Sequence, residues 1–146
     1  MDAMKITQEV FPLNFYVMLL QNISKLGEKM YLHKKIDDVE TIPQKAGKGV
    51  GMKMLLSPEE SPNFAMRNFT IEAGGHMPLH TNIIEHEQYV LGGRALVTIG
   101  DEKFEAGAGD VLLIPANMPH AYETLGDETY SFLCLVPKQE DCIKVL

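Results

Sequence analysis

No apolar run in this sequence is long enough to cross a bilayer. The longest run near its start, residues 15–20, falls far short of the roughly 20 residues that a membrane helix needs. The start also lacks the basic stretch and the small-residue cleavage site of a secretory signal. Only two cysteines are present, Cys134 and Cys142, and they form no CxxC pair, so no disulfide framework is indicated. These absences predict a cytoplasmic protein without a membrane partner.

Positive charge is also scarce. Lys and Arg number 13 against 20 Asp and Glu, which gives a formal net charge of −7. Such a charge disfavours non-specific attraction to nucleic acid, and no helix-turn-helix pattern is evident. Apolar residues make up 45% and charged residues 23%, the usage of an ordinary globular chain. A length of 146 residues favours one domain over two.

Residues 1–29 differ in pattern from the rest of the chain. They carry apolar residues at helical spacing, and Gly27 is a suitable helix end. From residue 30 onward the helical period disappears, which divides the chain into an N-terminal extension, 1–29, and a β-rich domain, 30–146. Two interpretations of the extension stay open: a short helix that packs on the domain or on a partner subunit, or an over-extended start that is not native.

Short apolar runs, each closed by Gly, Pro, Asn or Asp, follow in the β-rich domain. They predict strands near 31–36, 50–56, 63–72, 86–92, 94–99, 102–105, 110–114, 119–123 and 130–136. Many short strands without alternating helices are typical of an antiparallel sandwich or barrel.

Four of the five histidines lie in two clusters that glycines flank, residues 74–93 and 109–120. Side chains two apart on a strand point the same way, so His80 and Asn82 share one face. The second cluster reads as a buried strand, a Pro/Asn turn and then His120, which opens the next strand. This arrangement predicts that histidines from different strands meet inside the barrel.

The spacing within the two clusters resembles the two motifs of the cupin superfamily. The residues with matching gaps are Gly74, His80, Asn82, His86 and Gly93 in the first motif, and Gly109, Pro115, Asn117, His120 and Thr124 in the second. The flanking stretches 61–67 and 132–137 are similar to small single-domain cupins that bind manganese through four histidines. The resemblance implies an all-β fold, the cupin double-stranded β-helix or jelly-roll barrel, with a short N-terminal helix as an optional addition.

Four positions depart from the general cupin pattern. His86 stands in place of the usual Glu, as in the four-histidine subgroup, and Asn82 stands in place of the second His. Asn117 and Thr124 replace the Gly and Asn of the second motif, where we expect an effect on turn geometry more than on chemistry.

The resemblance implies one divalent metal ion. The expected ligands are His80, Asn82, His86 and His120, with Asn82 either a weak amide ligand or a residue that leaves a position for water. Neutral imidazoles suit intermediate divalent metals, of which Mn or Fe is favoured here over Ni, Co or Zn. Open ligand positions are typical of catalytic rather than structural sites. A barrel that has lost its metal is the alternative.

Four further residues are candidates for a substrate pocket, each with a structural alternative. Gln88 shares a face with His86 and either orients a substrate or is a paired core amide. Cys134 lies on a late strand and either faces the cavity or packs as a small hydrophobe. His76 points either into the barrel mouth or into solvent, and Met118 fills either core or pocket.

Three hypotheses for function follow. The first is a metal-dependent enzyme, of oxygenase type before isomerase or lyase type, that acts on a small organic molecule. The second is a non-catalytic small-molecule-binding or sensor cupin, and the third is a vestigial barrel, which the missing second histidine favours. Resemblance to small cupins also implies a homodimer, with residues 31–56 as the expected interface.

Overall fold

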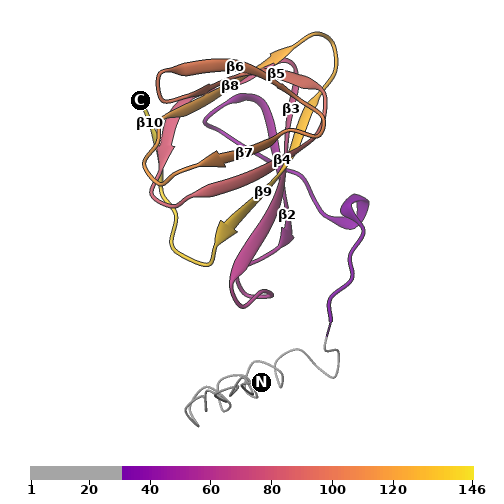
Figure 1. The fold of residues 1–146 in the computed structure, drawn as a ribbon. Coiled ribbons are helices and arrows are strands. Elements are labelled where there is room, and N and C mark those ends of the chain that lie inside the picture. Colours follow the sequence, from indigo (N-terminus) through magenta and orange to yellow (C-terminus); the bar gives the residue numbers. More distant parts are fainter. Residues whose placement is uncertain (1–30) are drawn as a thin grey trace, which may run out of the picture. The chain divides into compact units, whose positions relative to one another are not determined.

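A computed structural model of the protein describes residues 31–146, and the expectations for residues 1–29 lie outside this described part (Figure 1). Residues 34–146 form one compact unit. Its elements in chain order are the 3-10 helix η1 (Ile36–Asp38) and the strands β1 (Ile42–Pro43), β2 (Lys48–Leu56), β3 (Phe64–Asn82), β4 (His86–Gly92), β5 (Arg94–Ile99), β6 (Glu102–Gly107), β7 (Val111–Ile114), β8 (His120–Leu125), β9 (Tyr130–Pro137) and β10 (Ile143–Val145). The predicted all-β fold is confirmed. No helix within residues 31–146 has the length and apolarity to span a membrane.

The strands form one ten-stranded sheet that curls around a core (Figure 1). Its main path runs in the order β6-β5-β8-β3-β9-β4-β7, with β2 and β10 also paired to β3. The long strand β3 joins the two halves of the curl, since residues 64–71 pair with β9 and residues 76–80 pair with β8. The end of β3 therefore brings its side chains close to those of β8.

Side chains that point inward form the core. The burial pattern of β4 alternates strictly from His86 to Leu91, and β9 alternates in the same way. The alternation confirms that His86 and Gln88 share one face, which is the inner one, and Val90 lies on it as well. Apolar side chains on this face lose their contact with water, which is the main favourable contribution to folding. The largest fully buried side chains include Tyr130, Ile71, Ile114, His120 and Val90.

Two strand predictions need correction. The strand expected at 31–36 is wrong, because residues 31–35 form no strand and Ile36 begins η1. Residues 31–36 are all exposed, so no packing against a neighbouring strand or the core stabilises a strand there. The strand expected at 63–72 runs ten residues further, to Asn82. The pair Gly74-Gly75 does not end it, since Gly74 takes φ 70° and lets the chain bend within the strand.

The turn between β7 and β8 explains one departure from the cupin motif. Asn117 stands at the motif's Gly position and takes φ 64°, the left-handed region that Asn tolerates better than most residues. Its backbone N–H donates to the carbonyl of Asn82 at 2.7 Å. The turn thereby fixes the end of β3 beside the start of β8, where His120 lies.

Candidate metal and small-molecule site

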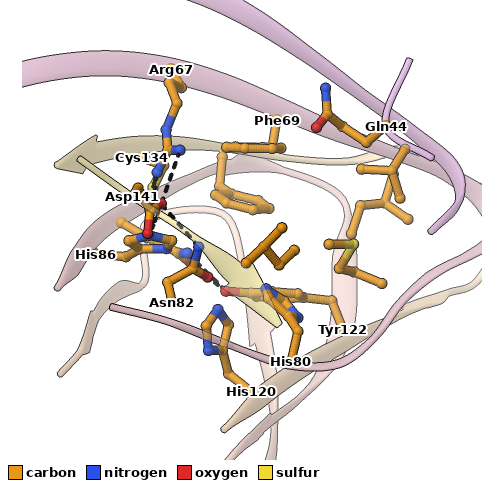
Figure 2. A pocket seen from close by; sticks show the side chains of 16 residues that line it. Gln44, Arg67, Phe69, His80, Asn82, His86, His120, Tyr122, Cys134 and Asp141 are labelled. Atoms are coloured by element: carbon orange, nitrogen blue, oxygen red, sulfur yellow. Dashed lines mark hydrogen bonds and ion pairs between the residues drawn. The ribbon is translucent and has the colours of Figure 1, made fainter. Parts of the chain in front are cut away.

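Three buried histidines from three strands meet on the inner face of the barrel (Figure 2). His80 of β3 and His120 of β8 are direct register partners, and their ring centroids are 4.0 Å apart. The ring of His86, from β4, lies 5.7 Å from that of His120. Cross-strand partners on one face are neighbours, so the sheet register alone brings two of these imidazoles together.

Backbone carbonyls fix two of the imidazole rings. Nδ1 of His80 lies 2.8 Å from the carbonyl of Pro78, and Nδ1 of His120 lies 2.9 Å from the carbonyl of Met118. In both cases the ring nitrogen donates, because a carbonyl oxygen can only accept. The tautomer with its proton on Nδ1 leaves Nε2 with a free lone pair, as a metal-binding imidazole requires.

Burial also keeps the three histidines neutral. It lowers the pKa of His120 to about 4, and nearby His80 adds to this effect. Burial lowers the pKa of His86 to about 4 as well, followed by the Arg67 guanidinium beside it. The pKa of His80 is lowered by burial too. Neutral imidazoles at neutral pH are the protonation state in which histidine binds a metal.

A polar network surrounds His86. Nη2 of Arg67 lies 3.4 Å from Nε2 of His86 and donates to Sγ of Cys134 at 3.2 Å. Oδ2 of Asp141 lies 3.5 Å from the same His86 nitrogen and 4.0 Å from Nη1 of Arg67. Since the pKa of His86 is about 4, its contact with Asp141 is not an ion pair at neutral pH. The Asn82 amide donates to Oδ2 of Asp141 at 2.9 Å, so the carboxylate is held from β3.

The segment after β9 brings Asp141 to this place. Strand β10 pairs with the end of β3, with Ile143 opposite Asn82 and Val145 opposite His80. The backbone N–H of Leu146 adds a bond of 2.9 Å to the carbonyl of Leu79. The pairing holds the preceding residues over the histidines.

A cavity of about 200 Å³ lies beside the histidines. An aromatic stack forms one wall: Phe132 lies 5.5 Å from Phe69 and 5.3 Å from Tyr122, centroid to centroid. The remaining lining residues are Gln44, Val50, Arg67, Ile71, Met77, His80, Asn82, His86, Gln88, His120, Cys134, Asp141 and Ile143. Figure 2 shows Arg67, Asp141, Asn82 and His86 gathered on one side, with the Phe69 ring next to this group and Gln44 on the far side. We call the first group, with His80 and His120, the polar end, and Phe69, Tyr122 and Phe132 the aromatic end.

The predicted pocket residues divide into two pairs. Gln88 and Cys134 both line the cavity. The Gln88 side-chain amide donates to the Tyr122 hydroxyl at 2.8 Å, and the hydroxyl lies 3.1 Å from the amide oxygen. Burial raises the pKa of Cys134, so its thiol is neutral. His76 is exposed and Met118 packs against the core, and neither lines this cavity.

Sequence reasoning missed Arg67, Asp141 and Tyr122 as lining residues. Strand parity was a usable signal for the first, since Arg67, Phe69 and Ile71 alternate along β3 and all line the cavity. Asp141 lies between β9 and β10, where no periodicity exists to place it.

The donor set fits a divalent metal in part. Oδ1 of Asn82 is buried without a hydrogen-bond partner, as is Oδ1 of Asp141. Buried acceptors without partners are costly, and a cation would satisfy them. Within residues 31–146, however, no three His, Cys, Asp or Glu side chains are arranged closely enough to hold a metal ion. The residues therefore match a divalent metal in donor type and protonation, whereas their side chains are spaced more widely than metal ligands are.

Comparison with known proteins supports the cupin superfamily. Residues 67–136 match the family described as Cupin domain. A 65-residue stretch is 37% identical to the uncharacterised protein MJ1618 of Methanocaldococcus jannaschii, and the match covers 44% of this chain and 52%, about half, of that protein.

Solved structures share the fold. The polyketide cyclase RemF of Streptomyces resistomycificus is similar with a TM-score of 0.73 and 25% identity, over 80% of this chain and 86% of that one. A variant of the oxalate decarboxylase OxdC of Bacillus subtilis is similar with a TM-score of 0.64 and 26% identity. That match covers 77% of this chain but only 31% of the decarboxylase.

Proposed function

From the cupin fold and the cupin domain at residues 67–136, we propose that this protein is a metal-dependent cupin enzyme that acts on a small organic molecule. The observation that carries the proposal is the arrangement of His80 and His120. They are opposite one another on neighbouring strands, and each is fixed through Nδ1 so that Nε2 stays free. Together with His86 they give the neutral nitrogen donors that suit Mn or Fe.

Each polar residue of the site has a role in this proposal. His80, His86 and His120 would hold the metal, and Oδ1 of Asn82 would be a weaker fourth donor. Asp141 accepts from the Asn82 amide and so orients it. When bound, a divalent metal polarises oxygen atoms of a substrate and supports chemistry with dioxygen. The aromatic end keeps water away from the substrate's apolar part.

The reaction class has two candidates. Three neutral imidazoles with open positions favour an oxygenase. Two enzymes with a similar fold, a polyketide cyclase and an oxalate decarboxylase, favour isomerase or lyase chemistry instead. Dioxygen consumption across a panel of enols, thiols and diketones separates the two, since only the oxygenase consumes the gas.

A non-catalytic binding protein is the second candidate function. The Arg67 guanidinium lies 3.4 Å from Nε2 of His86, where its charge opposes a divalent cation. A barrel that only encloses a small molecule tolerates this contact better than a metal enzyme does. Metal binding is therefore the property that separates the two functions.

Metal analysis of the purified protein tests the proposal. We expect about one metal ion per chain after purification without chelator or after loading with Mn²⁺. The double variant His80→Ala/His120→Ala should lose at least about nine-tenths of it, because two nitrogen donors are gone. His76→Ala is the matched control, since His76 is exposed and outside the cavity. Equal metal content in the double variant and the control would contradict the proposal.

We also propose a homodimer. Exposed apolar side chains within the expected interface, residues 31–56, support it, namely Tyr31, Leu32, Ile36 and Ile42. The outer faces of β4 and β7 offer a second such surface, since Tyr89 pairs with Val111 and both are exposed. The mass in solution distinguishes a dimer from a monomer.

A further inference from the structure

Arg67 is a cation with too little negative charge around it. Among the described residues that line the cavity, it alone carries a permanent positive charge. Its side chain is only 14% exposed, and its Nε is buried without a hydrogen-bond partner. A guanidinium withdrawn from water needs acceptors for its five N–H groups, preferably anionic ones.

The neighbours of Arg67 do not meet this need. Nη2 of Arg67 contacts the Cys134 thiol at 3.2 Å and the His86 imidazole at 3.4 Å, and neither of these side chains is a carboxylate. Oδ2 of Asp141 is 4.0 Å from Nη1, at the outer limit of an ion pair. The same oxygen accepts a bond of 2.9 Å from Asn82, so Asp141 is held to β3 more closely than to Arg67.

Apolar side chains also line the cavity beside Arg67. The guanidinium carbon lies 5.3 Å from the ring centre of Phe69, which stacks on Phe132. Val50, Ile71 and Met77 complete this surface. An occupant of the cavity therefore meets a cation with aromatic and aliphatic side chains directly beside it.

We propose that Arg67 binds the carboxylate of a small organic acid whose apolar body lies against Phe69 and Phe132. A planar carboxylate accepts two parallel bonds from a guanidinium, which Asp141 does not provide at its present distance. The cavity of about 200 Å³ suits an acid of roughly the size of phenylacetate. Oxalate fits this site poorly, because it has no apolar part to cover the aromatic end.

This inference deepens the proposed function by naming the class of its substrate, and it is tested without metal. Chelator-treated protein is titrated calorimetrically with phenylacetate, hexanoate and benzoate. Phenylacetamide, the neutral counterpart of phenylacetate, and oxalate are titrated in parallel. We expect at least one of the three acids to bind, and phenylacetamide to bind about tenfold or more weakly than phenylacetate, the difference that bonds between charged groups produce.

Variants assign the effect to Arg67. Arg67→Met should weaken acid binding about tenfold or more and remove the preference for acid over amide. Arg94→Met is the matched control, since Arg94 makes an exposed ion pair with Glu105 and should leave binding unchanged. Asp141→Asn should strengthen acid binding, because a competing carboxylate is lost. Thermal unfolding checks that each variant is folded, and Arg67→Gln replaces Arg67→Met if the latter is not.

Several results would overturn the inference. They are an absence of binding by all three acids, equal binding of phenylacetate and phenylacetamide, or an unchanged preference in folded Arg67 variants. Metal analysis of the wild-type protein keeps this separate from the proposed function. If the protein binds metal but does not prefer the acid over the amide, only the role of Arg67 is contradicted. If it prefers the acid but binds no metal, only the proposed metal enzyme is contradicted.

Discussion

The aromatic end of the cavity and its polar end differ in how well their side chains are satisfied. At the aromatic end, Phe132 packs between Phe69 and Tyr122, and the Tyr122 hydroxyl is paired with Gln88. At the polar end, Arg67 Nε, Asn82 Oδ1 and Asp141 Oδ1 have no partner. Only one other buried side-chain atom in the described residues, the Tyr130 hydroxyl, shares this condition.

The difference indicates a separate role for each end of the cavity. Packed rings and paired polar groups stabilise a fold, whereas buried polar atoms without partners cost free energy. Buried polar atoms without partners are common at functional sites, because a bound ligand can supply the missing partners. The aromatic end is therefore expected to carry stability, and the polar end to bind the metal and the acid.

The largest expected effect is on the aromatic end. Phe132→Ala should lower the free energy of unfolding by about 3–5 kcal/mol, because the side chain is buried and three aromatic rings surround it. Chemical denaturation with urea measures the change. Phe104→Ala is the control, since that ring is 37% exposed and its loss should cost much less. A similar loss of unfolding free energy in the two variants would contradict the stabilising role assigned to the aromatic end.

The polar end should make stability depend on pH. In metal-free protein burial lowers the folded pKa of His86 and of His120 to about 4, well below the ordinary value of 6.5, so the unfolded chain binds protons first as the pH falls. The contribution of these two rings to the free energy of unfolding should therefore be constant above about pH 6.5, decrease between about 6.5 and 4, and be fully lost below about pH 4, with a total loss on the order of a few kcal/mol. Urea denaturation at a series of pH values measures it.

Replacement of both histidines provides the control for this dependence. In His86→Gln/His120→Gln the decrease between pH 6.5 and 4 should be much smaller, since the two titrating rings are absent. An equally steep decrease in the double variant would assign the effect to other groups.

The smallest expected effect concerns the position where the cupin pattern is broken. Asn82→His supplies a fourth imidazole and should tighten Mn²⁺ binding about tenfold, while Asn82→Ala should weaken it by a similar factor if the amide oxygen is a ligand. Competition with a fluorescent chelator measures both affinities. Weaker binding in Asn82→His than in the wild type would show that the bond from Asn82 to Asp141 matters more than an added donor.

Motif spacing and strand parity predicted much of the fold and part of the site. The register that pairs His80 with His120 follows from regular strands and turns, and the inner face of β4 follows from alternation. The extent of β3 was underestimated, because a glycine pair that ends many strands here only bends one. The position of Asp141 at the site could not be predicted from the sequence. The following strand, β10, has three exposed residues, and its pairing with β3 depends on tertiary structure.

The position of a bound metal tests the account most directly. Crystals of the protein loaded with Mn²⁺ would be measured for anomalous scattering at the manganese edge. We expect one strong peak at bonding distance, roughly 2 Å, from nitrogen atoms of His80, His86 and His120. A loaded crystal with no peak between these rings, or with its only peak at the exposed His76, would contradict it.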